Sequence, residues 1–374
     1  MVQLIQEHVS DRAKPYVHLG LTSEDAKGTA RSLVLRDATK KIILPSMSDL
    51  GTTLIELSRR YISTPQIGRT HGRHAEPTTF GREIAVYVDR LGTGAERIHR
   101  SAQNLKGKIR GAVGTQASFM LFYPDPWKIE EAVMRRLGID PERITTQILQ
   151  PESEADYLLR VLLAFGTMND LSNDMRELQR QEIEEVCEAF ADEQVGSSTM
   201  PHKRNPISLE NICGQYRAAV GNAISVLLNL ESEHQRDMRN SAPQRYYVPE
   251  IIVPFVYSLH AMNRLMSTLS VDNDRMMQNL ELTHGAFYAE PAYIALALSG
   301  DPDAHERMKR LTVGKDVDFS AIVASDEVLK KAIDKLPELP RRVFEKPEFY
   351  TGKSEEQVIA VTDYWYRRFT ELAQ

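Results

Sequence analysis

The stretch PESEADYLLRVLLAFGTMNDLSNDMRELQRQEIEEVCEAF, residues 151–190, decides the fold of this chain. Its apolar residues recur at intervals of three and four, which places them on one face of an α-helix. They are Leu158, Val161, Phe165, Met168, Leu171, Met175 and Leu178. Pro151 suits the first position of a helix, where its missing N–H leaves no bond unmade. The pattern predicts one helix over 151–190, roughly 55–60 Å long at 1.5 Å per residue.

Comparable helical patterns run through most of the chain, whereas strand signals are sparse. The patterns cover 27–60, 82–110, 208–239 and 250–290. No run of alternating polarity lies beside an Asn-Gly or Asp-Gly turn. The sequence therefore predicts an all-α fold, a bundle of unusually long helices. Because helices of this length seldom bury all their apolar faces within one subunit, we expect a homo-oligomer.

Composition narrows the classes of function. The 374 residues carry a net charge of -6, which does not favour binding to nucleic acid or to a membrane surface. No apolar run approaches the roughly 18 residues that span a bilayer, and the N-terminus does not resemble a signal peptide. The two cysteines, Cys187 and Cys213, argue against a disulfide framework. A cytoplasmic protein is therefore expected.

Three polar stretches interrupt the helical patterns: HLGLTSED (18–25), GRTHGRHAEPTTFG (68–81) and GSSTMPHKRNPISLE (196–210). In the first, Thr22 to Asp25 fits a capping box at a helix start. The glycine turn before that helix is also a suitable place for a phosphate. In the third, Asn205 and Pro206 are predicted as the N-cap and first residue of the next helix.

The second stretch contains two histidines three residues apart, His71 and His74. No further ligand follows at a familiar spacing, so a metal site is not favoured over solvent-facing histidines. An imidazole in a Gly-rich loop is also a natural general acid. The chain lacks a Walker motif, a dinucleotide fingerprint, H-E-x-x-H and Gly-x-Ser-x-Gly. We therefore expect neither a metal nor a cofactor, but these absences do not name a reaction.

A fourth polar stretch, HQRDMRNSAPQR (234–245), places Arg236, Ser241 and Arg245 around a predicted helix end. Arginine side chains bind carboxylates and phosphates through paired N–H groups. A charged helix end without a ligand is the alternative.

The combination of these stretches resembles the fumarase/aspartase superfamily. GSSTMPHKRNPISLE matches every position of its signature loop, Gly-Ser-Ser-x-Met-Pro-x-Lys-x-Asn-Pro with a glutamate four residues on. The stretches at 68–81 and 18–25 resemble two further signatures, in the family's order. Within the superfamily, His18, Thr146-Gln147 and the stretch at 236–245 favour the adenylosuccinate lyase branch. The alternatives are a 3-carboxy-cis,cis-muconate cycloisomerase, whose loop is very similar, and a catalytically silent relative that keeps the fold.

The resemblance implies a fold, a domain order and an assembly. It predicts the family's long-helix bundle with a smaller helical C-terminal domain. The predicted domains are a remnant of an N-terminal helical domain over 1–38, the central bundle over 39–295 and the C-terminal domain over 296–374. Relatives begin well before HLGLTSED, so Met1 is expected to match an internal position of the family pattern. The resemblance also implies a homotetramer whose active sites each combine stretches from three subunits.

The resemblance further implies a metal-free and cofactor-free anti-elimination that yields fumarate from a succinylated nucleotide. Ser197 would be the base, and His71, oriented by Glu210, would protonate the departing nitrogen. Lys203, with the N-terminus of the helix after Pro206, would stabilise the negative charge that accumulates on the substrate carboxylate. The residues expected to bind the substrate are His18, Thr22, Ser23, Thr70, Gln147, Ser198, Asn205, Arg236, Ser241 and Arg245.

Overall fold

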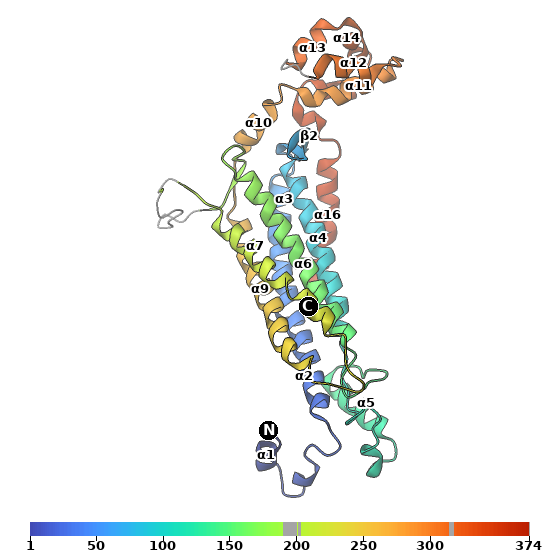
Figure 1. The fold of residues 1–374 in the computed structure, drawn as a ribbon. Helices are drawn as coiled ribbons and strands as arrows, with labels where there is room; N and C mark the ends of the chain where they lie inside the picture. Colours follow the sequence, from blue (N-terminus) through green and yellow to red (C-terminus); the bar gives the residue numbers. More distant parts are fainter. Residues whose placement is uncertain (190–199, 201–202, 314–317, 374) are drawn as a thin grey trace.

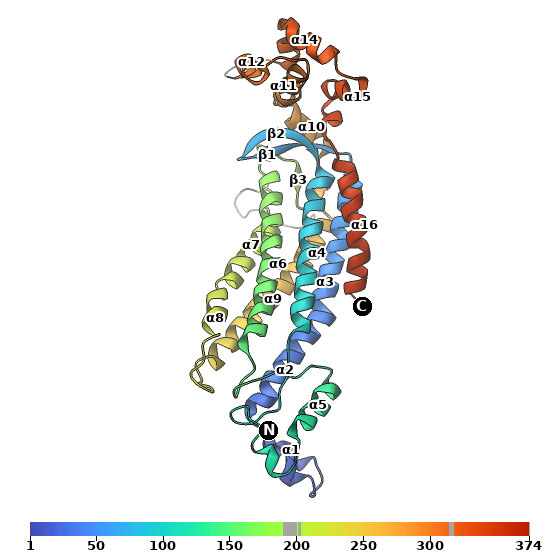
Figure 2. The same ribbon diagram turned by 90° about the vertical axis from the view of Figure 1, so that its right-hand side faces the viewer.

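The computed structural model describes residues 1–189, 200, 203–313 and 318–373 of the chain. A long helical bundle forms the body of the molecule, with a smaller group of short helices at one end (Figure 1). The main bundle helices are α2 (Ser23–Ala38), α3 (Leu44–Arg60), α4 (Phe80–Gln103), α6 (Pro151–Leu178), α7 (Ile207–Val220), α8 (Ala223–Leu228), α9 (Ser241–Ser267) and α16 (Ser354–Leu372). Helix α1 (Val2–Glu7) and helix α5 (Pro126–Leu137) lie at the opposite end (Figure 2). The all-α prediction is confirmed.

Helix α6 is packed against α4, α7 and α9 and forms the centre of the bundle. All seven apolar residues that predicted it are buried. The helix is nevertheless shorter than predicted, because it ends at Leu178 rather than at residue 190. The apolar periodicity stops there, Glu184 takes a left-handed φ of 54°, and a short strand, β3 (Val186–Cys187), follows. This strand pairs with β4 (Ser270–Val271).

Other predicted helices also differ from the structure in where they begin, break or end. The 27–60 pattern is a single helical run, in which a π-helical turn at Thr39–Ile43 joins α2 to α3. The 208–239 pattern breaks after Val220 at Gly221-Asn222, and its last residues form no helix in the described chain. The 250–290 pattern begins earlier, at Ser241, and is interrupted between Ser267 and helix α10 (Asn273–Glu281).

An antiparallel hairpin, which the sequence did not predict, joins α3 to α4. Its strands are β1 (Pro65–Thr70) and β2 (Arg73–Thr79), and the register shifts between Ile67 and Arg69. Gly68 lies at this irregularity, where a Cβ atom would stand 2.8 Å from the backbone oxygen of Glu76. The hairpin was missed because its two-residue turn is His71-Gly72, both with positive φ, rather than the Asn-Gly or Asp-Gly pair that usually marks such a turn.

The C-terminal part of the chain contributes to two separate cores. Helices α11 (Ala289–Leu298), α12 (Ala304–Thr312), α13 (Phe319–Ser325) and α14 (Glu327–Asp334) surround a small aromatic core of their own, and helix α15 (Glu338–Arg341) follows them. Helix α16 instead returns to the bundle and packs on α3 and α4. Gly51 and Gly92 make room for Phe369 and Trp365, since a Cβ atom at either glycine would overlap the ring. The domain boundaries proposed above stay predictions.

Candidate functional site

The predicted site residues fall into two groups at opposite ends of the bundle. The start of α2, the 146–147 segment and the start of α9 form one group, which we call the anion end. The β1–β2 hairpin and the residues leading into α7 form the other, which we call the hairpin end. Figures 1 and 2 both show the hairpin and the start of α2 well separated along the bundle. One chain therefore does not bring all the predicted residues together.

At the anion end, Arg236 links two of the signature stretches. Its Nη1 donates to Gln147 Oε1 at 2.7 Å, and its Nη2 donates to Glu24 Oε1 at 2.9 Å. Gln147 Nε2 in turn donates to the carbonyl oxygen of Ala112 at 2.8 Å. The Arg236 side chain is only 12% exposed, and its Nε has no hydrogen-bond partner. The guanidinium is thus held in one orientation while retaining an unused donor.

A cavity of about 260 Å³ opens beside Arg236 and is rich in positive charge. Its polar lining residues are Glu24, Lys27, Arg31, Arg236, Asn240, Ser241, Gln244 and Arg245. Predicted residues Arg236, Ser241 and Arg245 therefore share one cavity. Because four cations face one carboxylate, the cavity suits an anionic ligand such as a phosphate.

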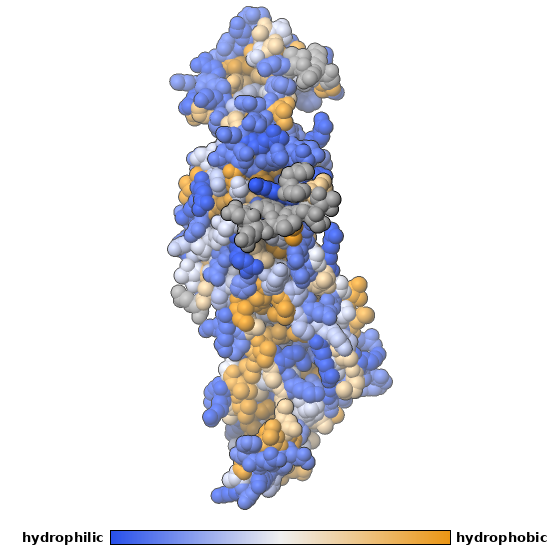
Figure 3. Space-filling model, turned by 90° about the vertical axis from the view of Figure 1, so that its left-hand side faces the viewer, coloured by the Kyte–Doolittle hydropathy of each residue, from blue (hydrophilic) through white to orange (hydrophobic). Residues whose placement is uncertain are grey.

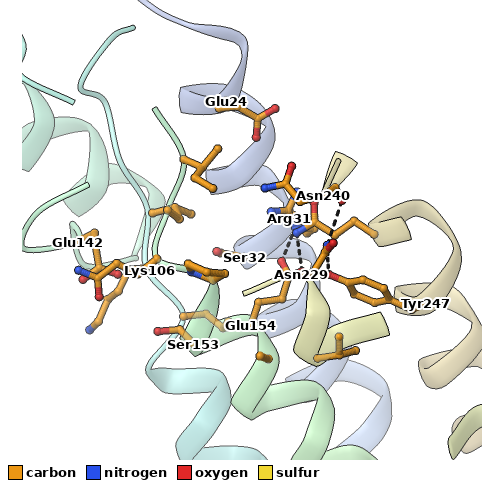
Figure 4. A pocket seen from close by; sticks show the side chains of 18 residues that line it. Glu24, Arg31, Ser32, Lys106, Glu142, Ser153, Glu154, Asn229, Asn240 and Tyr247 are labelled. Atoms are coloured by element: carbon orange, nitrogen blue, oxygen red, sulfur yellow. Dashed lines mark hydrogen bonds and ion pairs between the residues drawn. The ribbon is translucent and has the colours of Figure 1, made fainter. Parts of the chain in front are cut away.

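In an adjoining pocket, which shares Arg31 and Gln244 with this cavity, Glu154 of α6 connects α2 to the first turns of α9 (Figure 4). Its carboxylate accepts from Arg31 Nε, and from Gln244 Nε2 at 2.8 Å. Tyr247 adds a longer contact of 3.5 Å, and its hydroxyl accepts from Asn229 at 2.9 Å. Arg31 is therefore neutralised by Glu154, while Lys27, Arg236 and Arg245 still outnumber Glu24, the one carboxylate that lines the cavity.

The first signature stretch is held by a buried ion pair between Asp25 and Lys108, which are 1% and 0% exposed. Asp25 also accepts the backbone N–H of Thr22 at 2.8 Å, which is one half of the predicted capping box. Its remaining contacts are the N–H groups of Arg110 at 2.9 Å and Gly111 at 3.1 Å. The helix start with Thr22 and Ser23 is thereby fixed to the 108–111 loop. His18 lies exposed before it, with a left-handed φ of 68°.

At the hairpin end, Thr70 and His71 lie at the tip of the β1–β2 hairpin. His71 is exposed and takes a left-handed φ of 54°, directly before Gly72 with a φ of 70°. His74 is three residues further on, and burial followed by the charge of Arg69 lowers the pKa of its imidazole. The hairpin thus presents His71 to solvent at its tip, as a proton donor to an incoming substrate requires.

Residues leading into α7 form the second part of the hairpin end. Lys203 is exposed, Asn205 is half-buried, and Glu210 forms a 3.6 Å ion pair with Arg176. Within one chain no hydrogen bond joins Glu210 to His71, both of which the structure describes. Ser197 and Ser198 lie outside the described residues.

Two backbone donors at the N-terminus of α7, which was predicted to stabilise substrate charge, already have a partner within the protein. The N–H groups of Ser208 and Leu209 donate to the carboxylate of Glu188 at 3.1 and 2.8 Å. These donors are therefore occupied by the protein's own carboxylate, which is 4% exposed. The helix also begins one residue later than expected, at Ile207, with Pro206 in the N-cap position.

The carboxyl group of Glu83, near the base of the hairpin, has an unusual ionisation. Burial raises its pKa to about 7, and the carboxylates of Asp174 and Glu185 add to the shift. The folded protein therefore binds more protons than the unfolded chain between the ordinary glutamate value of 4.5 and about 7. Stability contributed by this group falls as the pH rises through that window.

Replacing Glu83 by glutamine should remove this pH dependence. At pH 8 we expect Glu83→Gln to raise the free energy of unfolding by about 1–2 kcal/mol, and at pH 5 to change it little. Urea unfolding of both proteins at the two pH values measures this difference. Equal effects at both pH values would contradict the assigned pKa.

The described residues contain no evident metal-binding site. There, no group of three or more His, Cys, Asp or Glu side chains is placed to hold an ion. No helix among the described residues is both long and apolar enough to cross a membrane.

Comparisons with known proteins agree with the placement of the signature stretches. A sequence model of the family described as Lyase matches residues 2–221, and one described as Adenylosuccinate lyase C-terminal matches residues 232–344. Adenylosuccinate lyase from Pyrococcus abyssi is 38% identical over 97% of this chain and 80% of its own length. The chain belongs to the adenylosuccinate lyase family. The Thermotoga maritima and Bacillus subtilis members are each 33% identical over 86% of the chain and 74% of their own length.

Solved structures share the fold of this family member. A 3-carboxy-cis,cis-muconate lactonizing enzyme from Pseudomonas putida has a TM-score of 0.83 at 25% identity, covering 99% of this chain and 82% of that one. A fumarate lyase from Mesorhizobium sp. BNC1 has a TM-score of 0.84 at 25% identity, covering 97% and 81%. These likenesses confirm the fumarase/aspartase type of helical bundle.

Several residues that organise the two ends were not predicted from the sequence. They are Glu24, Lys108, Glu154, Glu185 and Glu188. Each is a charged residue within a helical or polar run, where a solvated position is the usual expectation. Only the low exposure of their side chains in the fold separates them from surface charges.

Proposed function

We propose that this chain cleaves adenylosuccinate to AMP and fumarate, and succinyl-carboxamide ribotide to its amide and fumarate, by anti-elimination. The observation that carries this proposal is the 38% identity with an adenylosuccinate lyase over 97% of the chain. The family model for the adenylosuccinate lyase C-terminal region supports it. A cytoplasmic location is part of this proposal, and a sequence with only two cysteines, Cys187 and Cys213, supports a reducing compartment.

The anion end is proposed to bind the charged groups of the substrate. Arg236, Ser241 and Arg245 line one cavity and would hold the nucleotide phosphate and the succinyl carboxylates. Gln147 supports this role, because its Oε1 accepts a 2.7 Å hydrogen bond from Arg236 Nη1 and so holds the guanidinium in position. Thr22, at the capped start of α2, and the adjoining Ser23 and His18 would contact the remaining polar groups.

The hairpin end is proposed to carry out the proton transfers. His71 would protonate the nitrogen that leaves, and Glu210 of another subunit would orient the imidazole. Thr70, beside His71, would help to bind the substrate. Ser197, the proposed base, would remove the proton beside the carboxylate, with Ser198 nearby in sequence. Lys203 and Asn205 would stabilise the negative charge that develops on that carboxylate, because fixed cations and amides lower the energy of such an anion.

A homotetramer would unite these two ends in one active site. Figure 3 shows apolar residues gathered over the lower half of one face of the bundle. Large apolar side chains on α8 and α9 are strongly exposed in the isolated chain: Ile224 68%, Leu227 50%, Leu228 69%, Val253 63% and Tyr257 47%. Contiguous apolar surface of this kind favours burial against another subunit. Neighbouring subunits in opposite directions would place one chain's hairpin end beside another's anion end.

Charge introduced on this face should prevent assembly. We expect Ile224→Glu combined with Val253→Glu to convert the tetramer to smaller species, because burying an unpaired carboxylate is strongly unfavourable. Light scattering coupled to size exclusion gives the mass of each species. Val313→Glu, which adds the same charge at an exposed position of the C-terminal region, serves as the control. A monomeric wild type would refute the tetramer.

One assay tests the proposed reaction directly. The purified chain is incubated with adenylosuccinate while the absorbance change that accompanies fumarate formation is followed. Turnover is expected. A parallel incubation with 3-carboxy-cis,cis-muconate tests the alternative, because the lactonizing enzyme shares the fold at 25% identity. Activity in that arm alone would identify a cycloisomerase, whereas inactivity in both would identify a catalytically silent relative.

A further inference from the structure

Glu185 is a fully buried carboxylate that no step of the proposed reaction uses. It follows α6, directly before β3, and its side chain is 0% exposed. Arg69 binds both of its oxygens, with Nη2 donating at 2.6 Å and Nη1 at 3.1 Å. Gln66 Nε2 and Asn279 Nδ2 each donate at 2.8 Å. The carboxylate thus receives hydrogen bonds from β1 on one side and from α10 on the other.

The two amides that surround Glu185 are oriented by it. Gln66 Oε1 and Asn279 Oδ1 are buried and have no hydrogen-bond partner in the described structure. An unpaired buried acceptor is unfavourable. Each side chain nevertheless turns its nitrogen toward Glu185, so the hydrogen bond to the carboxylate offsets the cost of the unpaired oxygen. Asn279 Nδ2 also donates to the carbonyl oxygen of Ile183 at 2.8 Å, so Glu185 is one of two acceptors that hold this amide.

The ion pair between Arg69 and Glu185 lies next to the residue proposed as the general acid. Arg69 precedes His71 by two residues on the same hairpin, and Gln66 lies on the same strand. A two-pronged guanidinium–carboxylate contact fixes both direction and distance. The register shifts between Ile67 and Arg69, and the pairs Arg69–His74 and Thr70–Arg73 form the tip beyond this shift. The Glu185 contact therefore holds the tip at its first paired residue, Arg69.

We infer that Glu185 is a positioning residue for His71, acting through Arg69. It touches neither the substrate nor the transferred proton. Its role is to hold the hairpin so that the imidazole stands within hydrogen-bond reach of the leaving nitrogen, since small displacements of a catalytic group strongly reduce rate. The inference rests on the proposed function, because it takes His71 to be the general acid.

The test replaces Glu185 by glutamine, which keeps the shape of the side chain but removes its charge. We expect kcat for adenylosuccinate to fall about 10- to 100-fold while KM stays within about threefold, because substrate binding depends on the anion end. Amide hydrogen exchange over residues 65–79 should accelerate relative to α4. Arg69→Lys, which keeps the charge but loses the two-pronged contact, should show the same split more weakly.

Glu130→Gln is the matched control. Glu130 is 3% exposed and accepts from Arg110 Nε at 3.0 Å, but it lies on α5 near the anion end. This substitution should destabilise the protein while leaving kcat and hairpin exchange at wild-type values. Unchanged kcat in Glu185→Gln, or a rise in KM alone, would overturn the inference. If Glu185→Gln does not fold, Arg69→Lys decides by the same criteria.

The measurement also separates this inference from the proposed function. A wild type without adenylosuccinate turnover would refute the proposed function, and the hydrogen-exchange comparison would then test the anchoring by itself. Hairpin exchange that is equal in wild type and Glu185→Gln would refute the anchoring whatever the activity.

Discussion

Ser197→Ala should lose nearly all turnover of adenylosuccinate, with kcat reduced by about 10³-fold or more, because the variant has no base to remove the proton beside the carboxylate. Serine is a weak base in water, so its removal is expected to matter only when nearby cations and exclusion of water activate it. The signature loop supplies such cations, among them Lys203. Steady-state kinetics at saturating substrate measures the loss.

Binding should survive this substitution, because the anion end holds the charged groups of the substrate. Calorimetric titration of Ser197→Ala with adenylosuccinate should give a dissociation constant within about threefold of the wild-type KM. Ser198→Ala, in the neighbouring position, should retain most of kcat because it is assigned to binding. If Ser197→Ala remains active, the assignment of the base is wrong.

His71→Gln should also abolish most turnover, with an expected loss in kcat of about 10²- to 10⁴-fold. The exocyclic nitrogen of a purine is a poor leaving group as an anion, so the reaction depends on its protonation. Glutamine can still donate a hydrogen bond from the exposed tip of the hairpin, but it cannot transfer a proton at neutral pH. The fall of kcat at high pH that results from deprotonation of the general acid should be absent in the variant.

His74→Gln is the control for this prediction, because His74 lies in the same hairpin three residues further on. We expect its kcat to remain near that of the wild type. Equal losses in the two variants would indicate damage to the hairpin rather than removal of a proton donor. A His71→Gln protein with normal kcat would exclude His71 as the general acid.

The sequence predicted the long helices because their apolar residues repeat with a helical period. Helix α6 is the clearest case, since every apolar residue that predicted it is buried. The predicted helix was too long because the residues after Leu178 are types that also favour helices. In the structure, Glu184 takes a left-handed conformation and β3 pairs with β4, so no helix continues there. This pairing depends on a segment some 80 residues further along the chain, and the local spacing of apolar residues carries no information about it.

The candidate site was predicted in its parts but not in its arrangement. Signature motifs identified Arg236, Ser241 and Arg245, which line one cavity, and Gln147, which binds Arg236. The same motifs did not indicate that the backbone N–H groups at the start of α7 donate to the carboxylate of Glu188. Buried carboxylates such as this one are indistinguishable by sequence from solvated ones, because their partners come from distant elements.

The hairpin and the residues leading into α7 lie at the same end of one chain, but the family resemblance implies that one active site takes them from different subunits. If each active site joins the hairpin of one subunit to the signature loop of another, two inactive variants should repair each other in a mixed tetramer. A chain carrying Ser197→Ala still provides an intact His71, and a chain carrying His71→Gln still provides an intact Ser197. The repair requires that the two residues of one site belong to different subunits.

The most direct measurement is therefore the adenylosuccinate turnover of tetramers formed by co-expressing Ser197→Ala and His71→Gln in equal amounts. With random assembly, half of the subunits provide each intact residue, so about a quarter of the sites and of wild-type activity should return. Each variant expressed alone should remain inactive. If the mixed tetramers form but stay as inactive as either parent, Ser197 and His71 of one site come from the same subunit, and the shared-site account is wrong.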